Sequence, residues 1–219
     1  MVKDMLKQVI ITLSLAIAGS SPLMAQSFTS STTDYTGNDA VRLTFESPLP
    51  SGFSLNGGRI TTGSIGGVQA QPKGSTGKYL TTDIGTATIK ADKGYGAVSF
   101  LWGSVDTYNA AEFFDKAGKL LGSLTGSQVA DAPVNGDWKS DRTNRYVTFF
   151  ADATAGQSIA KVRLKSSSIA FETDNFAFIP AKDPVVVPEP GVALLFGSAT
   201  AFVLLRRRRA SGSGAAVPA

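Results

Sequence analysis

The sequence predicts an all-β protein with a single antiparallel β-sandwich domain, jelly-roll-like, in residues 26–182. Short segments alternate between apolar and polar residues, which is the pattern of strands with one buried and one solvated face. Turns rich in Gly, Asn and Asp separate these segments, and no stretch of the middle keeps a helical period over three turns. Many short strands of this kind favour two sheets packed face to face.

The clearest predicted strand is residues 159–165, in which Ala160, Val162 and Leu164 face one way and three cationic side chains face the other. Residues 112–121 predict a hairpin, because Gly118 supplies the left-handed residue that a three-residue loop needs. The Gly-rich residues 57–77 predict a long loop with at most one short strand. The other predicted strands are residues 41–45, 86–91, 97–102, 145–151 and 176–179.

The two ends of the chain predict export. Lys3 and Lys7 precede an apolar run, residues 9–18, and small residues lead to Ala25, so residues 1–25 predict a secretory signal peptide that signal peptidase cuts after Ala25. Near the other end, residues 191–205 carry no charge, although a membrane span by a helix needs about 20 apolar residues. A cluster of four arginines follows and predicts a helix that stops on the cytoplasmic side. A buried core helix and a nucleic-acid-binding tail fit this order less well.

This C-terminal order resembles the PEP-CTERM sorting signal of bacterial exosortase substrates. The resemblance implies a transmembrane sorting helix within residues 183–209, cleavage by an exosortase at or near the Pro-Glu-Pro motif, and display at the surface or in an exopolysaccharide-rich biofilm. The flexible tail, residues 210–219, departs from the usual pattern, which stops soon after the arginines. The matching residues are Val187, Pro188, Glu189 and Pro190, and then Arg206, Arg207, Arg208 and Arg209.

The composition restricts the chemistry of the folded part. The two export segments hold six of the 21 cationic side chains and one or two of the 17 anionic ones, which leaves 15 positive against 15 or 16 negative charges and predicts no nucleic-acid partner. The chain has no Cys and no His. Disulfides, thiol nucleophiles, Ser-His-Asp triads and most zinc sites are therefore excluded, and a carboxylate-pair glycosidase is the main enzyme class left.

Two stretches hold the candidate site residues. "WGSVDTYN" (102–109) and "FETDN" (171–175) resemble a recurrent domain of exosortase-dependent surface proteins, and the second stretch also resembles the closing strand of jelly-roll carbohydrate-binding modules, in which an Asp often holds a structural calcium. Three interpretations stay open: side chains that cap turns, ligands of a structural Ca²⁺, and a hydrolytic pair of Glu172 and Asp174. The candidate calcium ligands are Asp106, Asn109, Glu172 and Asp174.

Aromatic residues in polar segments are candidates for stacking on sugar rings. Trp138, in the polar loop "NGDWKSDRTN", is the best exposed candidate, and Tyr108, Tyr79 and Tyr146 are others. The sequence as a whole predicts a non-catalytic protein that passes through an inner-membrane intermediate to the cell surface or extracellular matrix, with extracellular polysaccharide as a further expected partner. A carbohydrate-active hydrolase is the alternative.

Overall fold

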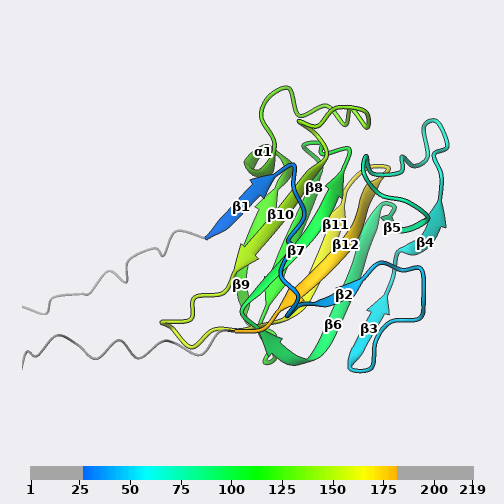
Figure 1. Cartoon of the computed structure of the whole chain (residues 1–219). Helices are drawn as coiled ribbons and strands as arrows, with labels where there is room; N and C mark the ends of the chain where they lie inside the picture. The colour runs from blue at the N-terminus through cyan, green and yellow to red at the C-terminus, as the bar shows by residue number, and fades with distance from the viewer. Residues whose placement is uncertain (1–26, 182–219) are drawn as a thin grey trace, which may run out of the picture.

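The computed structural model describes residues 27–181, which form two antiparallel β-sheets packed face to face (Figure 1). The only helix in this span is one short turn, α1 (Gly126–Val129). The prediction of an all-β sandwich is therefore confirmed. The predicted signal peptide with its cleavage site after Ala25, the predicted sorting signal and the tail lie outside the described residues. Within residues 27–181, no helix is long and apolar enough to cross a membrane.

The seven-stranded sheet has the order β1-β10-β7-β12-β5-β4, with β2 paired to β12 as well, and the five-stranded sheet has the order β3-β6-β11-β8-β9. From β5 to β8 and again from β10 to β12, each successive strand lies in the opposite sheet. The first sheet contains β1 (Phe28–Ser31), β2 (Val41–Leu43), β4 (Arg59–Thr62), β5 (Lys78–Thr82), β7 (Ala97–Gly103), β10 (Arg145–Phe150) and β12 (Phe171–Ile179). The second contains β3 (Phe53–Asn56), β6 (Gly85–Tyr95), β8 (Asn109–Phe114), β9 (Leu120–Thr125) and β11 (Ile159–Ser166).

The strands predicted from alternation form where they were expected. In β11 the apolar side chains of Ala160, Val162 and Leu164 are buried. The three cationic side chains, Lys161, Arg163 and Lys165, lie on the outer face. Arg163 Nε and Lys165 Nζ bind Glu112 on β8 at 2.6 and 3.1 Å. The hairpin of β8 and β9 also forms, with Gly118 at φ 87° and the Asp115 N–H donating to Lys119 O across the loop. The Gly-rich residues 57–77 contain one short strand, β4.

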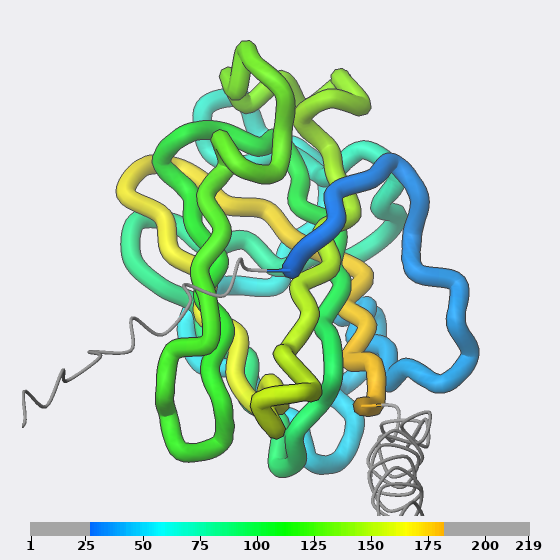
Figure 2. The backbone as a smooth tube through the Cα atoms, turned by 90° about the vertical axis from the view of Figure 1, so that its left-hand side faces the viewer, coloured from blue at the N-terminus to red at the C-terminus, as the bar shows by residue number. Residues whose placement is uncertain are grey.

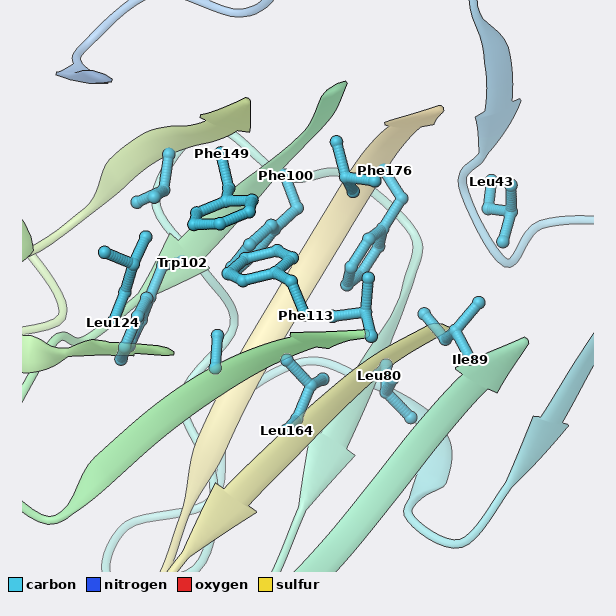
Figure 3. Close-up of a cluster of buried hydrophobic side chains, with 14 of the residues drawn as sticks. Leu43, Leu80, Ile89, Phe100, Trp102, Phe113, Leu124, Phe149, Leu164 and Phe176 are labelled. Carbon is cyan, nitrogen blue, oxygen red and sulfur yellow. The ribbon is translucent and has the colours of Figure 1, made fainter. Parts of the chain in front are cut away.

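Aromatic side chains from both sheets fill the core (Figure 3). Phe113 of the five-stranded sheet stacks on Phe149 of the seven-stranded sheet with ring centroids 4.2 Å apart. Phe100 lies between Trp102 and Phe176, with centroids 6.1 and 5.0 Å away. The ring packing buries the core-facing side chains of β7, among them Phe100 and Trp102.

The outer face of the seven-stranded sheet is covered at one end by residues 63–77, the connection from β4 to β5. Pro72 in this connection packs directly on Gly103, where an added Cβ would lie 2.7 Å from Pro72. Glu172 and Asp174 alternate with the core-facing residues of β12, so they point outward and lie under this connection. The connection therefore buries polar side chains of the sheet and forms one wall of the candidate site.

Candidate functional site

Four segments that are far apart in the sequence surround a cavity of about 260 Å³ at the end of the sandwich. They are residues 64–70, 104–108, 135–138 and 169–172, which belong to the loop regions at the upper end of the molecule in Figures 1 and 2. We call this cavity the loop-end pocket. Four residues predicted from the sequence line it, namely Asp106, Tyr108, Trp138 and Glu172.

Glu172 is a buried carboxylate with both oxygens engaged. Its Oε1 accepts a hydrogen bond from the Ala70 N–H at 2.9 Å, and its Oε2 accepts one from Ser104 Oγ at 2.6 Å. Burial raises the pKa of Glu172, and these two hydrogen bonds oppose the rise because they favour the charged form. Glu172 thus anchors the connection of residues 63–77 to β12 and forms part of the pocket floor.

Asp106 is a second buried carboxylate in the pocket, only 4% exposed. Its backbone pairs with Asn135 in an isolated bridge, and the Gly136 N–H donates to the neighbouring Val105 O at 3.0 Å. The Oδ1 atom is buried and has no hydrogen-bond partner among the described residues. Burial raises the pKa of Asp106 to about 7, hydrogen bonds from Tyr108 oppose this shift, and the charge of Glu172 adds to it.

Exposed apolar side chains form the rim of the pocket. Trp138 is 45% exposed, and the ammonium of Lys139 lies 4.8 Å from its ring centroid. Ile65, Val68 and Ile169 are also exposed at the rim. Tyr108 is half-buried and lines the pocket, and its hydroxyl donates to Ile169 O at 2.9 Å, so it positions the β11–β12 connection. Burial raises the pKa of Tyr108, so its hydroxyl stays protonated.

The other two candidate calcium ligands do not line the pocket. Asn109 is buried, donates to Ala170 O at 3.0 Å and accepts from Ser166 Oγ at 2.5 Å, which fixes the start of β8 to the β11–β12 connection. Asp174 accepts from Ser75 Oγ at 2.6 Å. Burial raises its pKa to about 6. Among residues 27–181, no three acidic, His or Cys side chains gather in an arrangement that could hold a metal ion.

Only one member of the candidate hydrolytic pair, Glu172, lines the pocket. Glu172 and Asp174 point to the same side of β12, as the sequence predicted, but both are nearly fully buried and Asp174 is not part of the pocket wall. Tyr79 and Tyr146, the other predicted stacking residues, lie elsewhere. Tyr79 is fully buried and donates to Gly63 O, and Tyr146 accepts from Asn175 Nδ2 on the outer face of the seven-stranded sheet.

Several rim residues were missed in the sequence. Ile65 and Val68 occur in "GSIGGV", where two apolar side chains in an otherwise small and polar segment were the available signal. Ile169 follows the serine run of residues 166–168 in the same way. Apolar residues isolated in polar loops have no strand pattern around them, so nothing in the periodicity marked them as parts of one surface.

A second cavity, of about 580 Å³, lies on the outer face of the seven-stranded sheet near β1 and β10. Its lining includes Thr29, Thr148, Phe150 and Ile179, and none of the residues predicted as site residues. This cavity is larger than the loop-end pocket, but it contains no buried carboxylate and no exposed Trp. It is the competing location for a ligand on this domain.

No family model and no curated protein matches the sequence. Two solved structures of carbohydrate-binding modules are similar to this chain at a low level. One is a family 6 module studied for its binding sub-sites, 13% identical over 65% of this chain and 95% of the module, with a TM-score of 0.33. The other is a mutant of a family 29 module made to probe ligand recognition, 12% identical over 67% of this chain and 99% of the module, with a TM-score of 0.34. Both likenesses are too low to assign a ligand or a site to this chain.

Proposed function

We propose that this chain is an exported, non-catalytic protein of the cell surface or extracellular matrix, and that its β-sandwich contacts polysaccharide through the loop-end pocket. The observation that carries the proposal is an exposed indole, Trp138, at the rim of a pocket whose floor is polar. A sugar ring has an apolar C–H face and a hydroxyl-bearing edge. The face of the indole suits the C–H face of the sugar, because an aromatic ring offers a large apolar contact surface, and the indole N–H can also donate a hydrogen bond.

The dimensions and polar groups of the pocket support this use. Its volume of about 260 Å³ lies just below the ~300–1,000 Å³ of pockets that take drug-sized ligands, which suits a single sugar ring. Asn135 lines the pocket and offers an amide group that can donate and accept hydrogen bonds, and the Ser104 hydroxyl, which already donates to Glu172, can still accept one. A chain of sugars that rests on the exposed rim could place one ring in this pocket.

The contacts of the carboxylates favour binding over hydrolysis. A two-carboxylate glycosidase needs both carboxyl groups at the scissile bond, one as acid and one as base or nucleophile. Here both oxygens of Glu172 are held by Ala70 and Ser104, and Asp174 is covered and bonded to Ser75. Neither side chain is free to transfer a proton to a ligand in the pocket.

Replacing Trp138 by Ala is expected to weaken glycan binding about 5–30-fold, which corresponds to a loss of one or two kcal/mol of stacking. The affinity is measured by calorimetry on residues 26–183, with a glycan selected on an array. Phe150→Ala is the matched control, because Phe150 is an exposed aromatic residue outside the loop-end pocket. Unchanged affinity in Trp138→Ala would refute this role of the pocket, and release of reducing sugar by the wild-type protein would favour the hydrolase.

The export part of the proposal rests on the signal sequences at both ends of the chain. Replacing the four arginines at 206–209 by Ser is expected to remove the stop signal and uncouple C-terminal processing, because the cation cluster fixes the orientation of the sorting helix. In a host that contains an exosortase, an immunoblot should then show an uncut C-terminus and a lower surface yield. Normal cutting and normal surface yield would contradict the sorting proposal.

A further inference from the structure

The charged groups of the loop-end pocket have one sign. Its lining residues include the carboxyl groups of Asp106 and Glu172 and no Lys or Arg. Two cations lie behind or beside the wall, and both are engaged. Arg59 binds Asp83 and Gln69, and Lys139 lies over the ring of Trp138. A ligand in the pocket therefore meets negative charge that no lining residue compensates.

The two carboxyl groups differ in what they can still accept. Glu172 already receives one hydrogen bond on each oxygen, so its charge is partly compensated by donors of the protein. Asp106 is equally buried, but its Oδ1 receives none among the described residues. Tyr108 supplies hydrogen bonds to Asp106, but the unpaired Oδ1 is a buried carboxylate oxygen, which is costly. A cation that enters the pocket would relieve this cost, and an anion would increase it.

The rim adds an apolar surface and one cation of the protein. The ammonium of Lys139 lies 4.8 Å from the ring centroid of Trp138, and its positive charge repels a ligand cation at that place. A ligand ammonium is therefore expected at the carboxylate floor, while the sugar ring packs at the rim. The pocket has carboxylate groups at its floor and an apolar rim, and its lining contains no Lys or Arg. These features together suit a sugar that carries a positive charge.

We infer that the loop-end pocket selects amino sugars that carry a free, protonated amino group, as in a de-N-acetylated polysaccharide, and discriminates against uronic acids. Asp106 receives the ammonium group, and Trp138 packs against the sugar ring. The inference rests on the proposed function, because it names the class of sugar for the same pocket. The recognition is non-covalent and needs no metal ion.

The test compares three oligosaccharides of similar length on the full chain purified in detergent, at about pH 7. They are a glucosamine oligomer, its fully N-acetylated counterpart and an oligogalacturonate. We expect the glucosamine oligomer to bind at least about tenfold more tightly than the acetylated one, since a hydrogen bond to a charged group contributes about 1.5–3 kcal/mol. Oligogalacturonate should bind most weakly. This comparison changes only the ligand, so it does not depend on the folding of a variant.

Two variants assign the preference to Asp106. Asp106→Asn keeps the turn and removes the charge, so the ratio between aminated and acetylated oligomers should fall to about one. Asp131→Asn removes the same charge from an exposed position outside the pocket and should keep the wild-type ratio. If Trp138→Ala weakens both oligomers while wild-type affinities are equal, the inference fails and the proposed function stands. Absence of binding to any oligomer would overturn both. A calcium-dependent rise in melting temperature that Asp106→Asn abolishes would show a metal site instead and overturn the inference.

Discussion

Phe100→Ala is expected to lower the free energy of unfolding by about 3–5 kcal/mol, the range for removing a buried aromatic side chain and leaving a cavity. Phe100 is fully buried in the central strand β7 and stacks against Trp102 on one side and Phe176 on the other. Few neighbouring groups can collapse into the space, because β7 is paired on both sides with β10 and β12. The loss is measured by urea denaturation of residues 26–183, followed by circular dichroism.

Residues 26–183 suit this measurement, because all described strands and the whole described core lie between Phe28 and Ile179. The span should fold as a soluble β protein without a reducing agent, since the chain contains no Cys. Phe150→Ala is the matched control, because Phe150 is 38% exposed on the outer face and should cost less than about 1 kcal/mol. A similarly small loss in Phe100→Ala would show that the core is not packed as described.

Asp106→Asn is expected to stabilise the domain at pH 8 by roughly 2–4 kcal/mol and to leave it nearly unchanged at pH 4. The pKa of Asp106 is raised by burial from 3.8 to about 7 in the folded state. Below about pH 4 the folded and unfolded chains both carry a protonated Asp106, so the group costs nothing. Between pH 4 and 7 the unfolded chain loses the proton first, and the folded state becomes less stable as the pH rises. Above pH 7 the destabilisation by the charged, buried Asp106 stays constant. The Asn variant has no charge at this position and therefore lacks this destabilisation at every pH.

The pH series also has an internal comparison. Burial raises the pKa values of Glu172 and Asp174 as well, so these two groups and Asp106 each lower the stability of the wild-type domain from acid to neutral pH. Glu112 acts with the opposite sign, because burial, which raises its pKa, is outweighed by Arg163 and Lys165, which lower it. The difference in the free energy of unfolding between wild type and Asp106→Asn isolates the contribution of Asp106. Asp131→Asn should run parallel to wild type at every pH. If the free energy of unfolding differs between wild type and Asp106→Asn by the same amount at pH 4 and at pH 8, burial does not disfavour the charged form of Asp106, and the account is wrong.

Alternation of apolar and polar residues predicted strands whose outer face meets water. Alternation is visible in β11 because one side faces the core and the other faces solvent. It is lost in β5, where Tyr79, Leu80, Thr81 and Thr82 are all buried because the sheet face there is covered by other parts of the chain. For the same reason only the last four residues of β12 were predicted as a strand, although the polar residues before them continue it.

The sequence predicted four of the pocket residues, and it grouped Asp106 with Glu172 only as candidate calcium ligands, apart from Tyr108 and Trp138. Asp106, Tyr108, Trp138 and Glu172 stand in separate stretches, and pairing between β12 and β7 brings Glu172 beside the turn that holds Asp106. Asn109 and Asp174 belong to the same motifs but support the chain from within. Which member of a motif faces a pocket depends on the long connection of residues 63–77, whose course no local pattern encodes.

The central claim is that the loop-end pocket is where this domain meets polysaccharide. The most direct test is a nuclear magnetic resonance titration of isotope-labelled residues 26–183 with an oligosaccharide, in which amide shifts are followed residue by residue. We expect the largest changes in residues 64–70, 104–108, 135–138 and 169–172, together with the indole N–H of Trp138. Changes that centre instead on Thr29, Thr148 and Ile179 in the larger cavity, with those four segments unaffected, would contradict the claim.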